Sequence, residues 1–454
     1  MIKSLSKGDK DNLMRYTRVR GDQLDHRYLE LYRAIEKQER YDEPALKAAF
    51  SFRNFSEAKK HLSNLILKVL RIYDEHPETA MQNRLSEIRI LLERSLYHYG
   101  MKKIRQARVI ALREERFEAL HILADYELVA LPFVISPKEQ QNRRVAVVSS
   151  RDEAFRNLEI IRRFKDLNDK EIAAILDQAS QSGQFRAELV EEVERHPQLA
   201  IPDSELPARG RSLRYRILNI IRQQQMDFAG RAEELRQMIG VYDAHDFLIK
   251  EEPVRYVFAL GAYGISQSVA GRYEEALDAA LRLLEIRSDK DIVRRSVFLN
   301  FTSNLASYTL NTGDVAPLRE NMSYLMSGLK QHSANTPGGT LAYIHYLFAI
   351  VLWCAGDIRR ANRFAKRVVS APAGRTNLQA ACKCFLLIFA LEQGDPDMIM
   401  TYARTWRRLW QKKAPQFEIE KGFTDFMVHF VDLPGREDQQ VSIAKYLEEL
   451  KAYF

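Results

Sequence analysis

The stretch Ala270-Gly271-Arg272-Tyr273 separates an apolar segment from one rich in small and charged residues, and three similar turns follow it. These are Thr312-Gly313-Asp314, Ala355-Gly356-Asp357-Ile358 and Gln393-Gly394-Asp395, whose glycines lie 42, 43 and 38 residues apart. A glycine between two helices ends the first in a left-handed conformation without steric cost. Recurrence at this period predicts stacked helical hairpins, an α-solenoid.

Helical spacing of apolar residues extends on both sides of these turns. It predicts four clear hairpins over residues 254–286, 293–330, 341–369 and 378–410. A fifth, with the weaker turn Gln225-Met226-Asp227, joins 213–225 to 228–241, and another hairpin is expected from 88–99 and 104–129. No segment alternates as a β-strand does, so the sequence predicts an all-α protein.

Four regions follow from this pattern. Residues 1–135 are a divergent helical N-terminal region with one hairpin, and residues 136–210 form a helical bridge whose segment 196–210 is rich in proline. Residues 211–413 hold the repeats. Residues 414–454 are acidic helices that cap the stack, because an open end would expose apolar surface. Whether the two halves stack continuously is left open by the sequence.

The composition is that of a folded protein without membrane spans, at 46% apolar and 29% charged residues. The longest uncharged apolar run, 342–355, is shorter than the roughly 20 residues of a membrane helix. The first residues lack the apolar core of a secretory signal, and three cysteines form no disulfide framework. We therefore expect a reduced, cytoplasmic protein.

The clearest hairpin resembles a tetratricopeptide repeat (TPR). Gly264 is the small residue of the first helix, Gly271 the turn, Tyr273 the aromatic after it, and Ala276-Leu277 the pair that lets two helices touch. The third hairpin keeps part of this pattern, the fourth has proline in place of the aromatic, and the units exceed the usual 34 residues. The label TPR-like therefore applies to residues 213–410.

The opening of the chain resembles a group of bacterial TPR-like proteins with no established activity. The segments that carry this resemblance are Ile2-Lys3-Ser4-Leu5-Ser6, Leu29-Glu30-Leu31-Tyr32-Arg33-Ala34-Ile35-Glu36-Lys37-Gln38, Tyr41-Asp42-Glu43 and Ile66-Leu67-Lys68-Val69-Leu70-Arg71. The resemblance implies the fold and a bacterial cytoplasmic protein, and it implies no activity.

The first helix of each hairpin usually lines the concave groove of a solenoid, where partners bind. Amides that both donate and accept suit the backbone of an extended peptide, and aromatic side chains are favoured interface anchors. The predicted partner-binding groove comprises Asn300, Asn304, Ser307, Asn311, Tyr343 and Tyr346. The alternative is that these side chains pack against neighbouring hairpins.

Positive charge is concentrated late in the chain. Residues 356–413 carry 12 Lys or Arg and 4 Asp or Glu, in a chain of net charge +8. The predicted basic face consists of Arg359, Arg360, Arg363, Arg367, Arg404, Arg408 and Lys412. Such a face attracts phosphate backbones or an acidic partner, whereas the alternative is a solvated face balanced by the acidic C-terminal region.

Motifs of enzymes and of metal sites are absent from the sequence. There is no H-E-x-x-H pair, no phosphate-binding glycine loop and no G-x-S-x-G nucleophile, so we predict no catalytic residue, metal or cofactor. The leading hypothesis is a non-catalytic scaffold or adaptor that binds a protein or peptide in its groove. The alternative is a regulator that contacts nucleic acid through the basic face.

Overall fold

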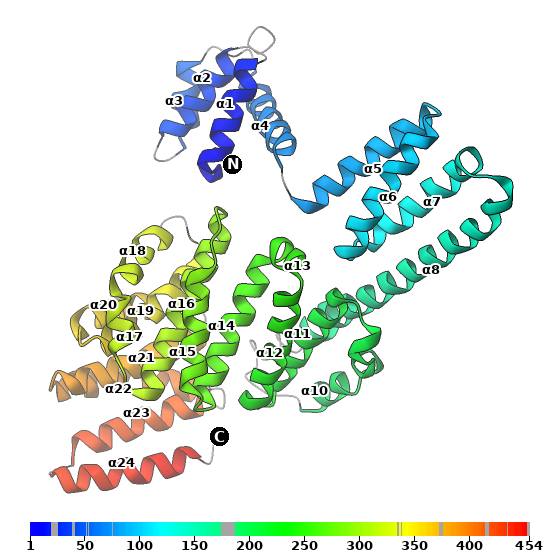
Figure 1. Ribbon diagram of the computed structural model, residues 1–454. Helices are drawn as coiled ribbons and strands as arrows, with labels where there is room; N and C mark the ends of the chain where they lie inside the picture. Colours follow the sequence, from blue (N-terminus) through cyan, green and yellow to red (C-terminus); the bar gives the residue numbers. More distant parts are fainter. Residues whose placement is uncertain are drawn as a thin grey trace. The chain divides into compact units, whose positions relative to one another are not determined.

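The computed structural model describes residues 1–19, 26–38, 41–50, 52, 54–74, 76–173, 187–333, 336, 338–371, 376–413, 417–433 and 435–451. These residues form helices joined by short connections, with no strand among them, which confirms the all-α prediction (Figure 1). The chain divides into two compact units, Met1–Glu159 and Ile160–Phe454, and the boundary falls inside α8 (Pro137–Leu167). Within the described ranges, no helix combines the length and apolar character that crossing a membrane requires.

The first unit begins with four helices around a small core. They follow the short η1 (Ile2–Ser4) and are α1 (Lys7–Val19), α2 (His26–Lys37), α3 (Glu43–Ala49) and α4 (Phe55–Ile72). Leu13, Leu31 and Ile66 are nearly inaccessible in this core. Asp42 and Asn54 accept backbone N–H bonds at the starts of α3 and α4, which satisfies donors that a helix start leaves free.

Three further helices follow, α5 (Pro77–Glu93), α6 (Tyr97–Arg113) and α7 (Phe117–Val134). The predicted single helix over 104–129 is wrong, because the chain turns at Glu115, whose φ is +49°. Arg116 N donates to Ala111 O at 2.8 Å, which closes the helix end as a Schellman motif. No glycine or proline marks this turn, and the apolar spacing continues across it.

A buried carboxylate joins α6, α7 and α8. Glu127 of α7 has no exposed surface. Arg108 of α6 reaches its Oε2 at 2.5 Å, and Arg143 of α8 reaches its Oε1 at 2.5 Å. Both carboxylate oxygens are therefore paired, which is the condition under which a buried charge is tolerated.

The second unit is built mainly from pairs of helices. It opens with η3 (Asn168–Ile172), α10 (Ala187–Glu194), η4 (Pro197–Ala200) and η5 (Asp203–Glu205), and it ends with α23 (Glu418–Val431) and α24 (Arg436–Lys451). The first helices of the pairs are α11 (Ala208–Gln224), α14 (Pro253–Val269), α16 (Asp291–Thr312), α19 (Gly338–Cys354) and α21 (Thr376–Glu392). The second helices are α12 (Phe228–Ala244), α15 (Tyr273–Glu285), α18 (Met322–Ser333), α20 (Ile358–Val369) and α22 (Pro396–Lys413). Two short helices, α13 (Asp246–Glu251) and α17 (Ala316–Glu320), lie in the connections.

Successive pairs share one core that extends from Ala208 to Met427. From α14 onward each first helix contacts the next, in the order α14, α16, α19, α21 and α23. Each second helix contacts the first helix that follows it, so that α12 meets α14, α15 meets α16 and α20 meets α21 (Figure 1). Every first helix from α14 to α21 is therefore covered by helices of two pairs.

The same left-handed turn recurs more often than its glycines. Gly271, Gly313, Gly356 and Gly394 have φ between +67° and +86°, as the sequence predicts. Met226 takes the same conformation at +59° between α11 and α12. The N–H of the next residue, Asp227, donates to Arg222 O at 2.9 Å, as Arg272 N donates to Gln267 O at 2.8 Å. Met226 thus performs the role of a glycine at a steric cost of about 1 kcal/mol.

Replacing Met226 by glycine is expected to raise the free energy of unfolding by about 1 kcal/mol, because glycine adopts positive φ without strain. The matched change Gly271→Ala, where a Cβ would meet open space, is expected to lower it by about the same amount. Denaturant titration followed by circular dichroism measures both values. Equal destabilisation by the two substitutions would contradict this account of the turns.

Removal of the buried carboxylate in Glu127→Ala is expected to cost about 3–5 kcal/mol, because two arginines lose their partner beside a buried cavity. The control is Asp125→Ala on the same helix, where an exposed carboxylate pairs with Arg151 at 3.1 Å. An exposed pair contributes only about 0–1 kcal/mol. Hydrogen exchange of the α6 and α7 amides measures the difference, and similar values for the two variants would refute the structural role of Glu127.

Candidate functional site

The predicted groove asparagines of α16 face the preceding first helix, α14. Asn304 is 2% exposed, and its Nδ2 donates to Gly261 O at 3.0 Å. Gly261 and Gly264 make this approach possible, since a Cβ at either position would clash with the side-chain amide of Asn300 or Asn304. Asn304 therefore ties two helices together, while Asn300 is half-buried and donates to Ser296 O at 2.9 Å.

Ser307 and Asn311 also contact α14. Ser307 Oγ lies 3.3 Å from Ser268 Oγ, and Asn311 Nδ2 donates to the same oxygen at 3.2 Å. Ser307 is half-buried and Asn311 is exposed. These two side chains therefore remain within reach of solvent, although each already has a partner in the neighbouring pair.

The predicted tyrosines lie where α19 meets its two neighbours. Tyr343 shares a hydrogen bond of 2.8 Å with Ser303 Oγ of α16. Tyr346 packs between the Tyr343 and Phe385 rings, with centroid distances of 6.2 and 6.1 Å. Both tyrosines are half-buried, and burial raises the pKa of Tyr346 to about 12. They join α16, α19 and α21, and part of each ring is still accessible.

These contacts share a period. Asn304 to Gly261, Ser307 to Ser268 and Tyr343 to Ser303 span 43, 39 and 40 residues, which is about one hairpin. The structure thus assembles the predicted groove residues along one line of first helices and gives each a contact with the adjoining pair. Sequence reasoning missed Gly261, Ser268 and Ser303, although their spacing of about 40 residues from the predicted residues was a signal.

The α20 part of the basic face is exposed and largely unpaired. Arg359 and Arg363 are exposed, and neither forms a side-chain hydrogen bond or ion pair with a described residue. Arg367 lies over the Phe364 ring at 5.2 Å, and Arg360 pairs with Asp357 at 2.5 Å. The opposite side of α20 is buried through Ala361, Ala365 and Val368, so the helix presents its cations to solvent.

The α22 part behaves in the same way. Arg404 and Arg408 are exposed and form no side-chain hydrogen bond or ion pair with a described residue. Arg407 between them pairs with Asp425 of α23 at 2.6 Å, and this is the one ion pair that the described C-terminal helices make with α20 or α22. The side chain of Lys412 lies outside the described residues. Because α20 and α22 both pack on α21, their cations flank the same helix.

A second arginine-rich stretch, at 209–222, has a different environment. Arg209 pairs with Glu251 at 2.7 Å, Arg214 with Asp203 at 2.8 Å and Arg222 with Glu194 at 2.9 Å. These pairs connect α11 to α13, η5 and α10, so the arginines hold neighbouring segments together. The contrast identifies α20 and α22 as the region where cations remain available to a partner.

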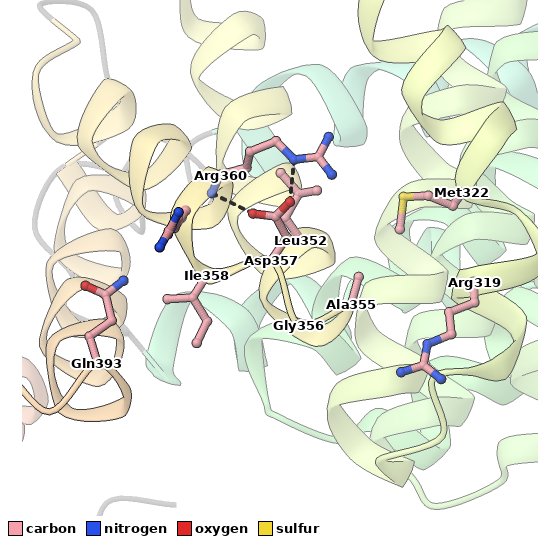
Figure 2. Close-up of a pocket in the computed structure, with 10 residues that line it drawn as sticks. Arg319, Met322, Leu352, Ala355, Gly356, Asp357, Ile358, Arg360 and Gln393 are labelled. Carbon is pink, nitrogen blue, oxygen red and sulfur yellow. Dashed lines mark hydrogen bonds and ion pairs between the residues drawn. The ribbon is translucent and has the colours of Figure 1, made fainter.

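A hollow of about 950 Å³, the turn-edge hollow, opens beside the start of α20. Figure 2 shows Arg319 and Met322 on one side, Gln393 on the other, and the turn from Gly356 to Arg360 between them. Asp357 receives both the backbone N–H and the guanidinium of Arg360, which hold the pKa of its carboxyl below the ordinary value. Asp357 therefore stays ionised and offsets the charge of Arg360.

The nucleophilic and metal-ligating side chains do not form a reactive group. Burial raises the pKa of the Cys354 thiol to about 11 and that of Cys382 and Cys384 to about 12, so all three are protonated at neutral pH. His345 is half-buried against Phe364 at 5.4 Å, and burial lowers its pKa. No three His, Cys, Asp or Glu side chains of the described residues come together as metal ligands.

No protein-family model, curated protein or solved structure matches this chain. The function must therefore be inferred from the arrangement of its own residues, above all from the exposed and unpaired arginines of the basic face.

A double-mutant cycle tests the contact between α14 and α16. Gly264→Ala is expected to cost about 1–3 kcal/mol, because its Cβ would clash with Asn304 and approach the Ala276 carbonyl oxygen at 3.2 Å. In an Asn304→Ala background the same substitution should cost less by at least about 0.5 kcal/mol, since the clash is removed.

Gly240→Ala on α12 is the control for this cycle, because a Cβ there meets no atom within 4 Å. It should stabilise the protein by about 0.5–1 kcal/mol through helix propensity. Additive effects of Gly264→Ala and Asn304→Ala would show that Asn304 does not pack on α14 as described.

Proposed function

We propose that the chain is a non-catalytic scaffold, built as an α-solenoid of TPR-like hairpins after a divergent helical N-terminal region, that binds a protein or peptide partner. The support for the solenoid is the regular contact of first helices with one another and of second helices with the next first helix. Stacking of this kind creates an extended surface from many helices. A surface of that type is suited to binding a macromolecule.

The observation that carries the proposal is the set of unpaired arginines on α20 and α22. Arg359, Arg363, Arg404 and Arg408 lie on solvent-facing sides of two helices without an acid beside them. In the same unit, Arg209, Arg214 and Arg222 are all neutralised by nearby carboxylates. A concentrated positive field of this kind attracts and orients a negatively charged partner.

The predicted groove adds a second surface to the proposal. Tyr343, Tyr346, Ser307 and Asn311 are partly accessible along the line of first helices, and they supply aromatic and hydrogen-bonding groups. Asn304 stabilises the groove wall from within. We assign partner contact to the accessible side chains and a structural role to Asn304.

The second candidate is a regulator that contacts nucleic acid through the basic face, and the same unpaired arginines favour it. Phosphate contacts release condensed counterions, so binding would weaken steeply as the salt concentration rises. We also propose a bacterial cytoplasmic location. The three cysteines are free thiols, which fits a reducing compartment.

Affinity capture from native cells, followed by mass spectrometry, tests the scaffold. We expect a protein partner that the wild type retains and that Arg363→Glu/Arg404→Glu loses by at least about tenfold, because the charge reversal repels an acidic surface. Lys330→Glu, an exposed change of equal charge on α18, is the control and should retain the partner.

Binding of a 20-nucleotide single strand and of a 20-base-pair duplex between 50 and 200 mM salt tests the second candidate. The scaffold proposal predicts weak binding that differs little between the wild type and Lys330→Glu. Tight binding that falls steeply with salt and is abolished by Arg363→Glu/Arg404→Glu, without a captured protein, would establish the nucleic-acid function instead.

A further inference from the structure

The turn-edge hollow lies where three successive hairpins meet. Arg319 and Met322 come from the connection and second helix of one hairpin, the segment from Leu352 to Arg360 from the next, and Gln393 from the end of α21 (Figure 2). Its walls are therefore set by the stacking of hairpins and need no loop rearrangement to form. A partner bound here would contact consecutive repeats at once.

Two uncompensated cations line this hollow. Arg319 and Arg359 are exposed, and neither forms a side-chain hydrogen bond or ion pair with a described residue. Arg360 is held by Asp357 at 2.5 Å, so this neighbouring pair adds little net charge. Two guanidinium groups that retain all their donors are suited to carboxylates, which they can bind through paired hydrogen bonds.

The rest of the lining is apolar. Met322, Leu352, Ala355 and Ile358 contribute to the walls, and methionine adapts its shape to different side chains. An inorganic anion would leave this surface in water. A ligand that covers it must carry an apolar group beside its negative charges.

We propose that the turn-edge hollow binds an acidic segment of a protein partner, with one apolar side chain between Met322 and Ile358 and carboxylates on Arg319 and Arg359. This inference rests on the proposed scaffold function and names the chemistry of its partner. The segment continues along α20, because Arg363 follows Arg359 by one helical turn and is also exposed and unpaired. Acidic residues spaced along an extended peptide would meet these cations in succession.

The aromatic side chains nearby favour a peptide over nucleic acid. Proteins that bind single strands stack bases on exposed aromatic rings. On α22, Trp406 and Trp410 are 6% and 2% exposed, and Tyr402 is stacked on Trp406 at 4.6 Å. Phe364, the aromatic residue of α20, is half-buried beneath Arg367. No described aromatic residue of these two helices presents a free face beside the cations.

Selection from a displayed library of random twelve-residue peptides tests the inference on the full chain. We expect enriched peptides to contain two or more Asp or Glu around one large apolar residue. The double variant Arg319→Glu/Arg359→Glu should bind a synthetic copy of such a peptide at least about 100-fold more weakly, which is about tenfold for each cation lost.

Two controls separate charge from shape. Lys330→Glu should bind the peptide as the wild type does, since this residue lies outside the hollow. Replacing the apolar residue of the peptide by serine should weaken binding about tenfold, which a purely electrostatic contact would not require. Thermal unfolding of both protein variants verifies that they are folded, and Arg319 and Arg359 have no partner in the described structure whose loss would unfold them.

Enrichment of neutral or basic peptides, or unchanged binding by the Arg319→Glu/Arg359→Glu variant, would overturn the assignment of the hollow. Oligonucleotide binding that this variant abolishes, without enrichment of acidic peptides, would overturn it in favour of nucleic acid. A captured partner that is lost in Arg363→Glu/Arg404→Glu but kept in Arg319→Glu/Arg359→Glu would refute the hollow alone and leave the scaffold proposal standing. Failure to capture any protein would instead refute the scaffold.

Discussion

The reversal of the chain between two helices is the constraint on which the second unit depends. An apolar stripe on each helix can be buried only if the next helix returns along it after two or three residues. One residue with positive φ achieves this return, and the N–H that follows closes the last helical turn. Gly271, Gly356 and Gly394 use this geometry, and Met226 adopts it despite its side chain. The helix pairs, and the contacts between them, follow from these reversals.

The pairing of helices also decides which surfaces can bind. First helices lie between other helices, so their polar side chains are drawn into contacts such as Asn304 with Gly261 and Tyr343 with Ser303. Second helices such as α20 bury one narrow stripe of small residues and expose the rest. A long row of charges is therefore accommodated on a second helix at little cost to packing.

Electrostatics separates structural from available arginines. An exposed ion pair contributes about 0–1 kcal/mol, so leaving Arg359 or Arg408 unpaired costs the fold little. A buried carboxylate such as Glu127 requires partners, and it has two. Arg209, Arg214 and Arg222 lie between these limits and connect α11 to acids of three other segments. The unpaired arginines of α20 and α22 are thus the ones whose charge remains free for a partner.

The sequence by itself determined the helical class, the four glycine turns and the concentration of positive charge at 356–413, because these depend on neighbouring residues. Tertiary structure decided that Glu115 turns the chain, since a left-handed residue without glycine leaves no local mark. It also decided that Asn304 is buried, because helix rotation depends on the glycines of α14, 40 residues earlier. The availability of an arginine is likewise a long-range property: Arg209 finds Glu251 across 42 residues, whereas no acid among the described residues reaches Arg359.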